Sequence, residues 1–169
     1  VISVTAAAGL GNGEAFVWGS DNGSMTVPNS ADVDGTTIER RLSRIWKVAE
    51  TGTVGTVTMV FDLSSVPGAK DEADLRLIID RDQDGFFDND ITPRTGTLSG
   101  SLFTVTANFQ HGDRFTIGST NTSTTPLPVT FTDFSLTYEN PAVVASWKTA
   151  MEINNDYFTL QRTLDGKTY

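Results

Sequence analysis

The sequence contains no cysteine and only one histidine, His111, among its 169 residues. A chain without cysteine forms no disulfide and offers no thiolate metal ligand or cysteine nucleophile, and one histidine cannot build a multi-histidine zinc centre. A hydrolase triad would need His111, which lies in the stretch "FQHGDRF", where we expect a turn between two strands and a solvated imidazole. The sequence therefore predicts that the protein is not an enzyme.

Basic residues and long apolar runs are also scarce. Only 12 Lys and Arg oppose 21 Asp and Glu, so the formal net charge is −9, which repels phosphate backbones and anionic membrane surfaces. No apolar run reaches the roughly 20 residues of a membrane span, and the amino terminus lacks the pattern of a signal peptide. We expect a mature soluble chain with no nucleic-acid partner and no membrane insertion; its many Thr, Ser, Gly and Asn are typical of extracellular β-proteins.

Short β-branched or aromatic runs separated by Gly, Asn and Asp recur through the first two-thirds of the chain. Several alternate apolar and polar residues with period two, which predicts half-buried antiparallel strands. Asn22-Gly23 predicts a hairpin turn between the first two runs. We therefore expect an all-β fold, an antiparallel β-sandwich over residues 1–118, with strands at residues 15–19, 25–27, 53–63, 75–80, 102–109 and 114–117.

Residues 36–50 allow two interpretations. Thr36 and Glu39 have the spacing of a helical capping box, while a strand would place on one face Leu42, Arg44, Trp46 and Val48. We favour a loop leading into a strand from Ser43 to Glu50, because the neighbouring runs are all β. Three arginines, Arg40, Arg41 and Arg44, are then expected on a solvated strand edge, the alternative being contact with an anionic partner.

The last third of the chain changes in character. Residues 119–128, "STNTSTTPLP", are polar and without periodicity, which predicts an extended linker. Residues 129–169 then predict three strands: one before a turn at Asn140-Pro141, one with Val143, Ala145 and Trp147 on one face, and one from Phe158 to Thr163.

Five carboxylates lie within the eleven residues 80–90, "DRDQDGFFDND", directly after an apolar run. Two carboxylates held about 5 Å apart repel by roughly 3 kcal/mol at an effective dielectric constant near 20, so this charge needs compensation. The spacing is that of a calcium loop, with Gly85 at the sharp turn and an all-oxygen set that suits Ca²⁺. The predicted ligands are Asp80, Asp82, Asp84, the backbone carbonyl of Phe86, Asp88 and Asp90.

The final ligand of this loop is not specified by the sequence, because position 12, usually a bidentate Glu, is Ile91. Asp90 or a residue from elsewhere in the fold would have to supply it. The loop follows a strand rather than a helix, which indicates a rigidifying ion rather than a switch. Two alternatives stay open: a metal-free acidic turn that aids solubility, and a pair of glycosidase carboxylates.

Aromatic side chains raise a second function class, since Trp18, Trp46, Phe86 or Phe87 could stack on sugars if exposed. This would make the chain an accessory carbohydrate-binding module of a secreted polysaccharide-degrading enzyme. The ordinary alternative is that such aromatics form the core of the sandwich.

Two parts of the sequence resemble known modules. The stretch from Leu127 onward resembles the opening of the fibronectin-III-like domain found near the carboxyl end of many large secreted proteins of the Bacteroidota, typically ahead of a type IX secretion sorting domain. The matching residues are Leu127, Pro128, Val129, Trp147, Thr149, Ala150, Glu152, Asn154, Asn155, Asp156, Phe158, Asp165 and Gly166.

The earlier stretches "GLGNGEAFVWGSDNGSMT", "RLSRIWKVAETGTVGTVTMVFDLS" and "LRLIIDRDQDG" are similar to the β-module that often precedes this domain in surface proteins and adhesins of that phylum. The resemblance implies export and a role at the cell surface. The stretch from Leu127 onward covers only the first three strands of the fibronectin-III-like sandwich. The remaining strands would come from a longer chain or from a neighbouring subunit, and donation between subunits would build a filament.

The sequence thus leads to one main hypothesis. The chain is expected to be a non-enzymatic structural or adhesive module of an exported bacterial cell-surface or extracellular filament protein, stiffened by Ca²⁺. Its partners would be neighbouring domains or subunits, and surface glycans for an adhesin.

Overall fold

The computed structural model describes residues 1–88, 91–125, 127, 131–140 and 142–149. Within these residues the elements are all strands, and no helix is present that could cross a membrane. The strands of the first half are β1 (Ile2–Ala7), β2 (Ala15–Ser20), β3 (Pro28–Asn29), β4 (Arg40–Leu42), β5 (Trp46–Thr51) and β6 (Thr56–Asp62). Those of the second half are β7 (Leu75–Asp80), β8 (Thr97–Ser99), β9 (Leu102–Asn108), β10 (Arg114–Ser119), β11 (Phe131–Glu139) and β12 (Ala142–Thr149).

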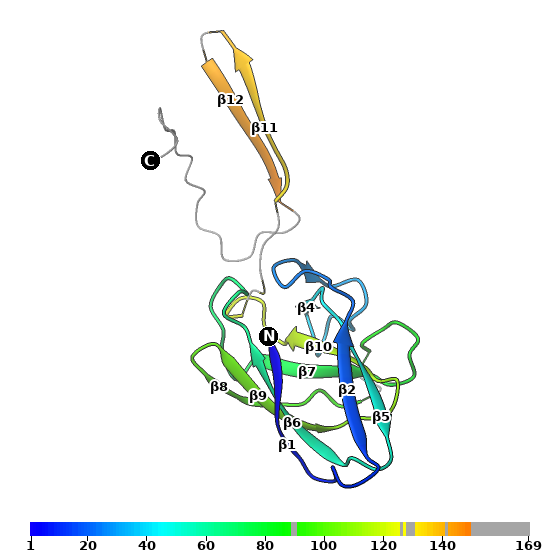
Figure 1. The fold of residues 1–169 in the computed structure, drawn as a ribbon. Coiled ribbons are helices and arrows are strands. Elements are labelled where there is room, and N and C mark those ends of the chain that lie inside the picture. Colours follow the sequence, from blue (N-terminus) through cyan, green and yellow to red (C-terminus); the bar gives the residue numbers. More distant parts are fainter. Residues whose placement is uncertain (89–90, 126, 128–130, 141, 150–169) are drawn as a thin grey trace.

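The first ten strands form two antiparallel sheets that pack against each other (Figure 1). One sheet has the order β1-β6-β9-β8. The other has the order β2-β5-β10-β4-β3, with β7 along the opposite edge of β10. The predicted all-β, antiparallel sandwich-like fold is therefore confirmed.

Alternating burial explains why these runs become sheet strands. In β6 the residues Val57, Met59 and Phe61 are buried while their neighbours are not, and β9 follows the same rule. Aromatic rings join the two sheets across the core: Phe61 of β6 lies 5.7 Å from Trp46 of β5 and 6.1 Å from Phe115 of β10, measured between ring centroids. The core is thus an aromatic layer between two half-buried faces.

The outer face of β7 and β10 is covered as well. Ile78 points away from the main core and packs with Ile38 and Phe87 in a second, smaller apolar cluster. Gly118 is required beside it, because a Cβ there would lie 2.9 Å from the Cγ2 atom of Ile38. Residues 32–38 therefore act as a cover that buries β7 on both sides.

The predicted hairpin around Asn22-Gly23 is wrong. Strand β2 pairs with β5 and not with residues 25–27, and the next strand is the short β3. The reason lies in Asp21, whose Oδ1 accepts hydrogen bonds from the amides of Gly23 (2.8 Å) and Ile45 (3.1 Å). This side chain directs the chain across to β5 rather than back along β2.

The strand interpretation of residues 36–50 is confirmed, since β4 and β5 occupy this region. The three amides that a capping box would place in a helix, those of Thr36, Thr37 and Ile38, instead donate to the Asp34 carboxylate in a tight turn. The predicted solvated edge is wrong for Arg40 and Arg41, which are both buried. Arg41 is buried because it pairs with Asp32 of the covering segment.

The predicted linker over residues 119–128 begins inside the sandwich. Ser119 is the last residue of β10, and Thr122 and Thr125 are buried. Their hydroxyls replace water with protein partners: Thr122 donates to Glu39 at 2.7 Å, and Thr125 to Asp74 at 3.1 Å. These hydrogen bonds to residues distant in the sequence hold the polar stretch against the sandwich, which therefore runs past residue 118.

Strands β11 and β12 form an antiparallel ribbon that, among the described residues, pairs with no other strand. Phe134, Leu136 and Tyr138 lie opposite Trp147, Ala145 and Val143, so one face of the ribbon is apolar and exposed. The predicted third strand, Phe158 to Thr163, lies outside the described residues. The division at residues 119–128 and 129–169 and the fibronectin-III-like character of the second part remain predictions.

A pair of glycines tests the packing of the first sheet. A Cβ at Gly96 would lie 2.3 Å from the Thr104 carbonyl oxygen and 2.8 Å from the Phe103 ring, whereas one at Gly19 would meet nothing within 4 Å. We expect Gly96→Ala to lower the free energy of unfolding by about 1–3 kcal/mol, since the backbone has to move, and Gly19→Ala to change it little. Urea denaturation measures both; equal effects would contradict the described packing.

Candidate metal centre

Strand β7 delivers the acidic loop to the end of the second sheet. Its last residue, Asp80, is fully buried, while Asp82 and Asp84 are exposed in the turn that follows. Each of the three side chains offers a carboxylate oxygen, and these oxygens lie within 4.8 Å of one another. The first three predicted calcium ligands are thus brought together around one small volume.

Backbone amides of the loop hold the side chains of Asp80 and Asp84 by hydrogen bonds. The amide of Gln83 donates to Asp80 Oδ1 at 2.7 Å, and the amide of Phe86 donates to Asp84 Oδ1 at 2.7 Å. Gly85 has φ +104°, a value that favours glycine, as predicted for the sharp turn of the loop. Local hydrogen bonds therefore shape the loop before any ion binds.

Asp80 is the electrostatic centre of the loop. Burial raises the pKa of its carboxyl above the ordinary value, and the nearby Arg114 guanidinium and the amides of Gln83 and Gly85 oppose this only in part. Arg114 Nε lies 2.9 Å from Asp80 Oδ2, close enough for an ion pair, yet Oδ2 accepts no hydrogen bond from the described residues. The buried oxygen is therefore incompletely compensated, which is the condition that a bound cation relieves.

Phe87 ties the far side of the loop to the rest of the fold. Its ring is buried and contacts two guanidinium groups, with Arg41 Cζ at 5.0 Å and Arg114 Cζ at 5.8 Å from the ring centroid. Its amide donates to the Asp32 carbonyl at 2.7 Å. Asp32 in turn forms an ion pair with Arg41, so the loop and the covering segment share one network.

Arg81 fixes the near side of the loop. It donates through Nη2 to Asp113 at 2.9 Å and to the Asn108 carbonyl at 2.9 Å. Asp113 is buried and also accepts from the Gln110 amide. The acidic loop is consequently held at both ends by arginine side chains.

The remaining predicted ligands have different outcomes. Asp88 is exposed and is not in the group formed by the first three carboxylates, and Asp90 lies outside the described residues. The Phe86 side chain is 52% exposed, and its role as a carbonyl ligand remains a prediction. Position 12 of the loop is Ile91, which offers no carboxylate and packs partly against the main core.

Two of the four aromatic residues proposed for sugar stacking are internal, and Phe86 is exposed. Trp46 is 7% exposed and Phe87 is 1% exposed, so neither presents a ring to solvent. Trp18 is half-buried against Phe16, with ring centroids 6.0 Å apart. His111 lies in an exposed turn, as predicted, with Nδ1 3.2 Å from the Glu50 carbonyl oxygen.

Sequence reasoning did not identify the ion pairs that Arg114 and Arg41 form with Asp80 and Asp32. Arg114 is 34 positions beyond Asp80, and the two meet only because β10 pairs with β7 in a register that sets them opposite each other. The Asp32 and Arg41 pair likewise depends on the covering segment. Only the strand-pairing register could have revealed these contacts, and no local pattern encodes it.

Removing one partner of the covering ion pair tests this network. Arg41 has a side-chain exposure of 3%, so Asp32→Ala leaves a buried guanidinium without its counter-ion. We expect the free energy of unfolding to fall by about 3 kcal/mol in urea denaturation without calcium. Asp133→Ala, an exposed carboxylate on the ribbon, is the control and should change little; a small loss in Asp32→Ala would contradict the network.

Comparison with known proteins gives one family. The sequence model of a domain of unknown function, DUF8202, matches residues 3–125, which spans β1 to the buried threonines after β10. No curated protein and no solved structure matches the chain. Because the match covers the whole sandwich and well over half of the sequence, the chain belongs to the DUF8202 family.

Proposed function

We propose that this chain is a non-enzymatic structural or adhesive module of an exported bacterial surface or filament protein, and that calcium held by its acidic loop stiffens it. The observation that carries the proposal is the convergence of three carboxylate oxygens within 4.8 Å, one of them from the fully buried Asp80. Carboxylate and carbonyl oxygens are the ligands that Ca²⁺ prefers.

The position of the loop explains how an ion would act on the fold. Asp80 ends β7, while Phe87 lies under the covering segment. A cation between these points ties a sheet strand to its cover, and an ion that binds only the folded state stabilises it by mass action. Weak sites of this kind fill at the millimolar calcium concentrations found outside cells.

The surface role rests on the resemblance of the sequence to exported modules, and the ribbon β11–β12 supports a partner. Its apolar face, with Phe134, Leu136 and Tyr138 more than half exposed, needs a cover in water. Neighbouring domains or a strand donated by another subunit would supply it. The type IX route and the filament are parts of this proposal.

A second candidate function is an accessory carbohydrate-binding module. It is favoured by one observation, a shallow hollow on the outer face of β2 and β5. A glycan array discriminates the two readings, because a pure scaffold binds no defined saccharide.

Calcium should raise the melting temperature of the protein. We expect a gain of several degrees in 5 mM CaCl₂ relative to chelator, which corresponds to roughly 1–2 kcal/mol for a site filled well above its dissociation constant. Asp82→Ala with Asp84→Ala should remove the gain. The matched control, Asp133→Ala with Glu139→Ala, deletes two exposed carboxylates of the ribbon and should keep it; equal melting curves with and without calcium in the unaltered protein would refute the proposal.

The calcium effect should also depend on pH. Because the pKa of Asp80 in the folded protein is raised above 3.8, a proton competes for this oxygen already above that pH. The calcium-dependent gain in melting temperature is therefore expected to be full near pH 7 and to shrink as the pH falls toward 3.8. Melting curves with calcium and with chelator across this range measure it, and an unchanged gain at the acidic end would contradict the role of Asp80.

A further inference from the structure

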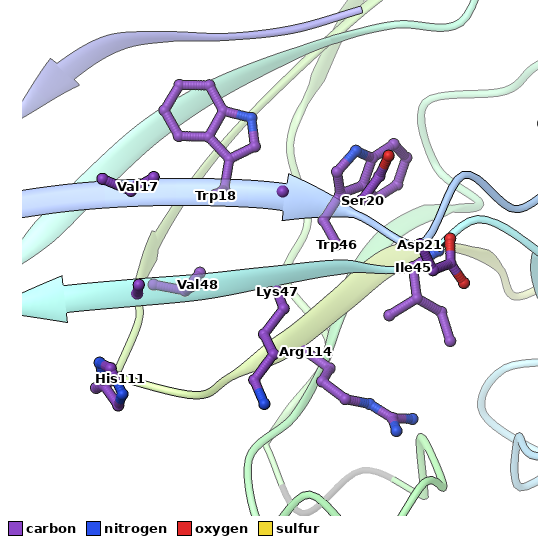
Figure 2. A pocket seen from close by; sticks show the side chains of 12 residues that line it. Val17, Trp18, Ser20, Asp21, Ile45, Trp46, Lys47, Val48, His111 and Arg114 are labelled. Carbon is purple, nitrogen blue, oxygen red and sulfur yellow. Dashed lines mark hydrogen bonds between the residues drawn. The ribbon is translucent and has the colours of Figure 1, made fainter.

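A shallow hollow of about 680 Å³ lies on the outer face of the second sheet. It is formed over β2 and β5 and bordered by the start of β10 and the turn at His111 (Figure 2). Small-molecule sites in proteins have volumes of roughly 300–1,000 Å³. The hollow is thus large enough for a compact ligand. None of the described acidic-loop carboxylates lines it, although Arg114, which pairs with Asp80, borders it.

Two basic residues, Lys47 and Arg114, border the hollow, and strand pairing sets their relative position. Lys47 of β5 pairs with Arg114 of β10, so both side chains project to the same face, and Figure 2 shows them next to each other. Lys47 is exposed and forms no ion pair among the described residues, while the Arg114 side chain is 26% exposed. Arg114 is already paired with Asp80 through Nε, at 2.9 Å from Oδ2, so Lys47 is the border cation that an anion in the hollow would compensate most.

The floor beside Lys47 is open. Gly19 of β2 pairs with Lys47, and a Cβ built on it would meet no atom within 4 Å. Asp21 supplies the one carboxylate of the lining. Its Oδ1 accepts hydrogen bonds from two backbone amides, so this oxygen is already engaged. On a chain with formal net charge −9, a border of two cations selects anions.

We propose that this hollow binds a saccharide that carries a carboxylate, a hexuronate unit, with the carboxylate against Lys47 and Arg114. The apolar lining from Val17, Ile45 and Ala49 suits the carbon face of a sugar ring. An extended peptide is the poorer fit, because the main-chain groups of β2 and β5 already pair with each other beneath the hollow. This inference extends the second candidate function, and its site contains none of the described carboxylates predicted to bind calcium.

Titration calorimetry with tri-galacturonate tests the proposal, with the neutral galactose trisaccharide as the matched ligand. We expect the acidic trisaccharide to bind and the neutral one to bind at least about tenfold more weakly, since a charge-assisted contact is lost. Lys47→Gln should weaken the acidic ligand about tenfold. Arg94→Gln, which removes an exposed cation elsewhere, should leave the affinity unchanged.

A second variant tests the location. Gly19→Leu fills the open floor and should abolish binding, and Gly19→Ala with its melting curve controls for folding. All titrations are run both with and without added calcium. The melting experiments test the calcium proposal separately, so its failure can be distinguished from failure of this inference. Equal binding of the two trisaccharides, tighter binding of poly-glutamate, full affinity in Gly19→Leu, or no binding in either condition would each overturn the inference.

Discussion

The burial of Asp80 at the end of β7 is the constraint on which the local structure depends. A carboxylate without contact to water has to be compensated by charges and donors that the fold brings to it. Arg114 does this in part from the neighbouring strand, and the turn amides of Gln83 and Gly85 add to it. The compensation is incomplete, because Asp80 Oδ2 accepts no hydrogen bond from the described residues although Arg114 Nε lies 2.9 Å away.

From Asp80 the same network extends through the covering segment. Arg114 contacts the Phe87 ring, the same ring contacts Arg41, and Arg41 pairs with Asp32. The acidic loop is therefore one end of a chain of contacts that seals the outer face of β7 and β10. Next to this sealed area the sheet continues uncovered over β5 and β2, where the hollow lies. The outer face of the second sheet is therefore covered over β7 and β10 and uncovered over β5 and β2.

Much of the fold could be predicted because its pattern is local. The alternation in Val57, Met59 and Phe61 identifies a half-buried strand without any knowledge of its partner. The spacing of the three aspartates and Gly85 predicted a loop that gathers carboxylates, and the oxygens do converge. The predictions that were wrong concerned partners: the hairpin at Asn22-Gly23 and the solvated edge at Arg40 and Arg41. Each was wrong because a distant side chain supplied the hydrogen bonds, as Asp21 does for Ile45.

The sequence by itself determined the strand-rich fold class, the absence of thiol chemistry and the clustering of carboxylates after β7, because composition and short-range pattern are sufficient for these. Only the tertiary structure decided that Asp80 is buried beside Arg114, that Arg41 is internal and that Lys47 and Arg114 share a face. These facts follow from the register in which β5, β10 and β7 pair. Register is a long-range property, set by packing of the whole sheet rather than by any single stretch of chain.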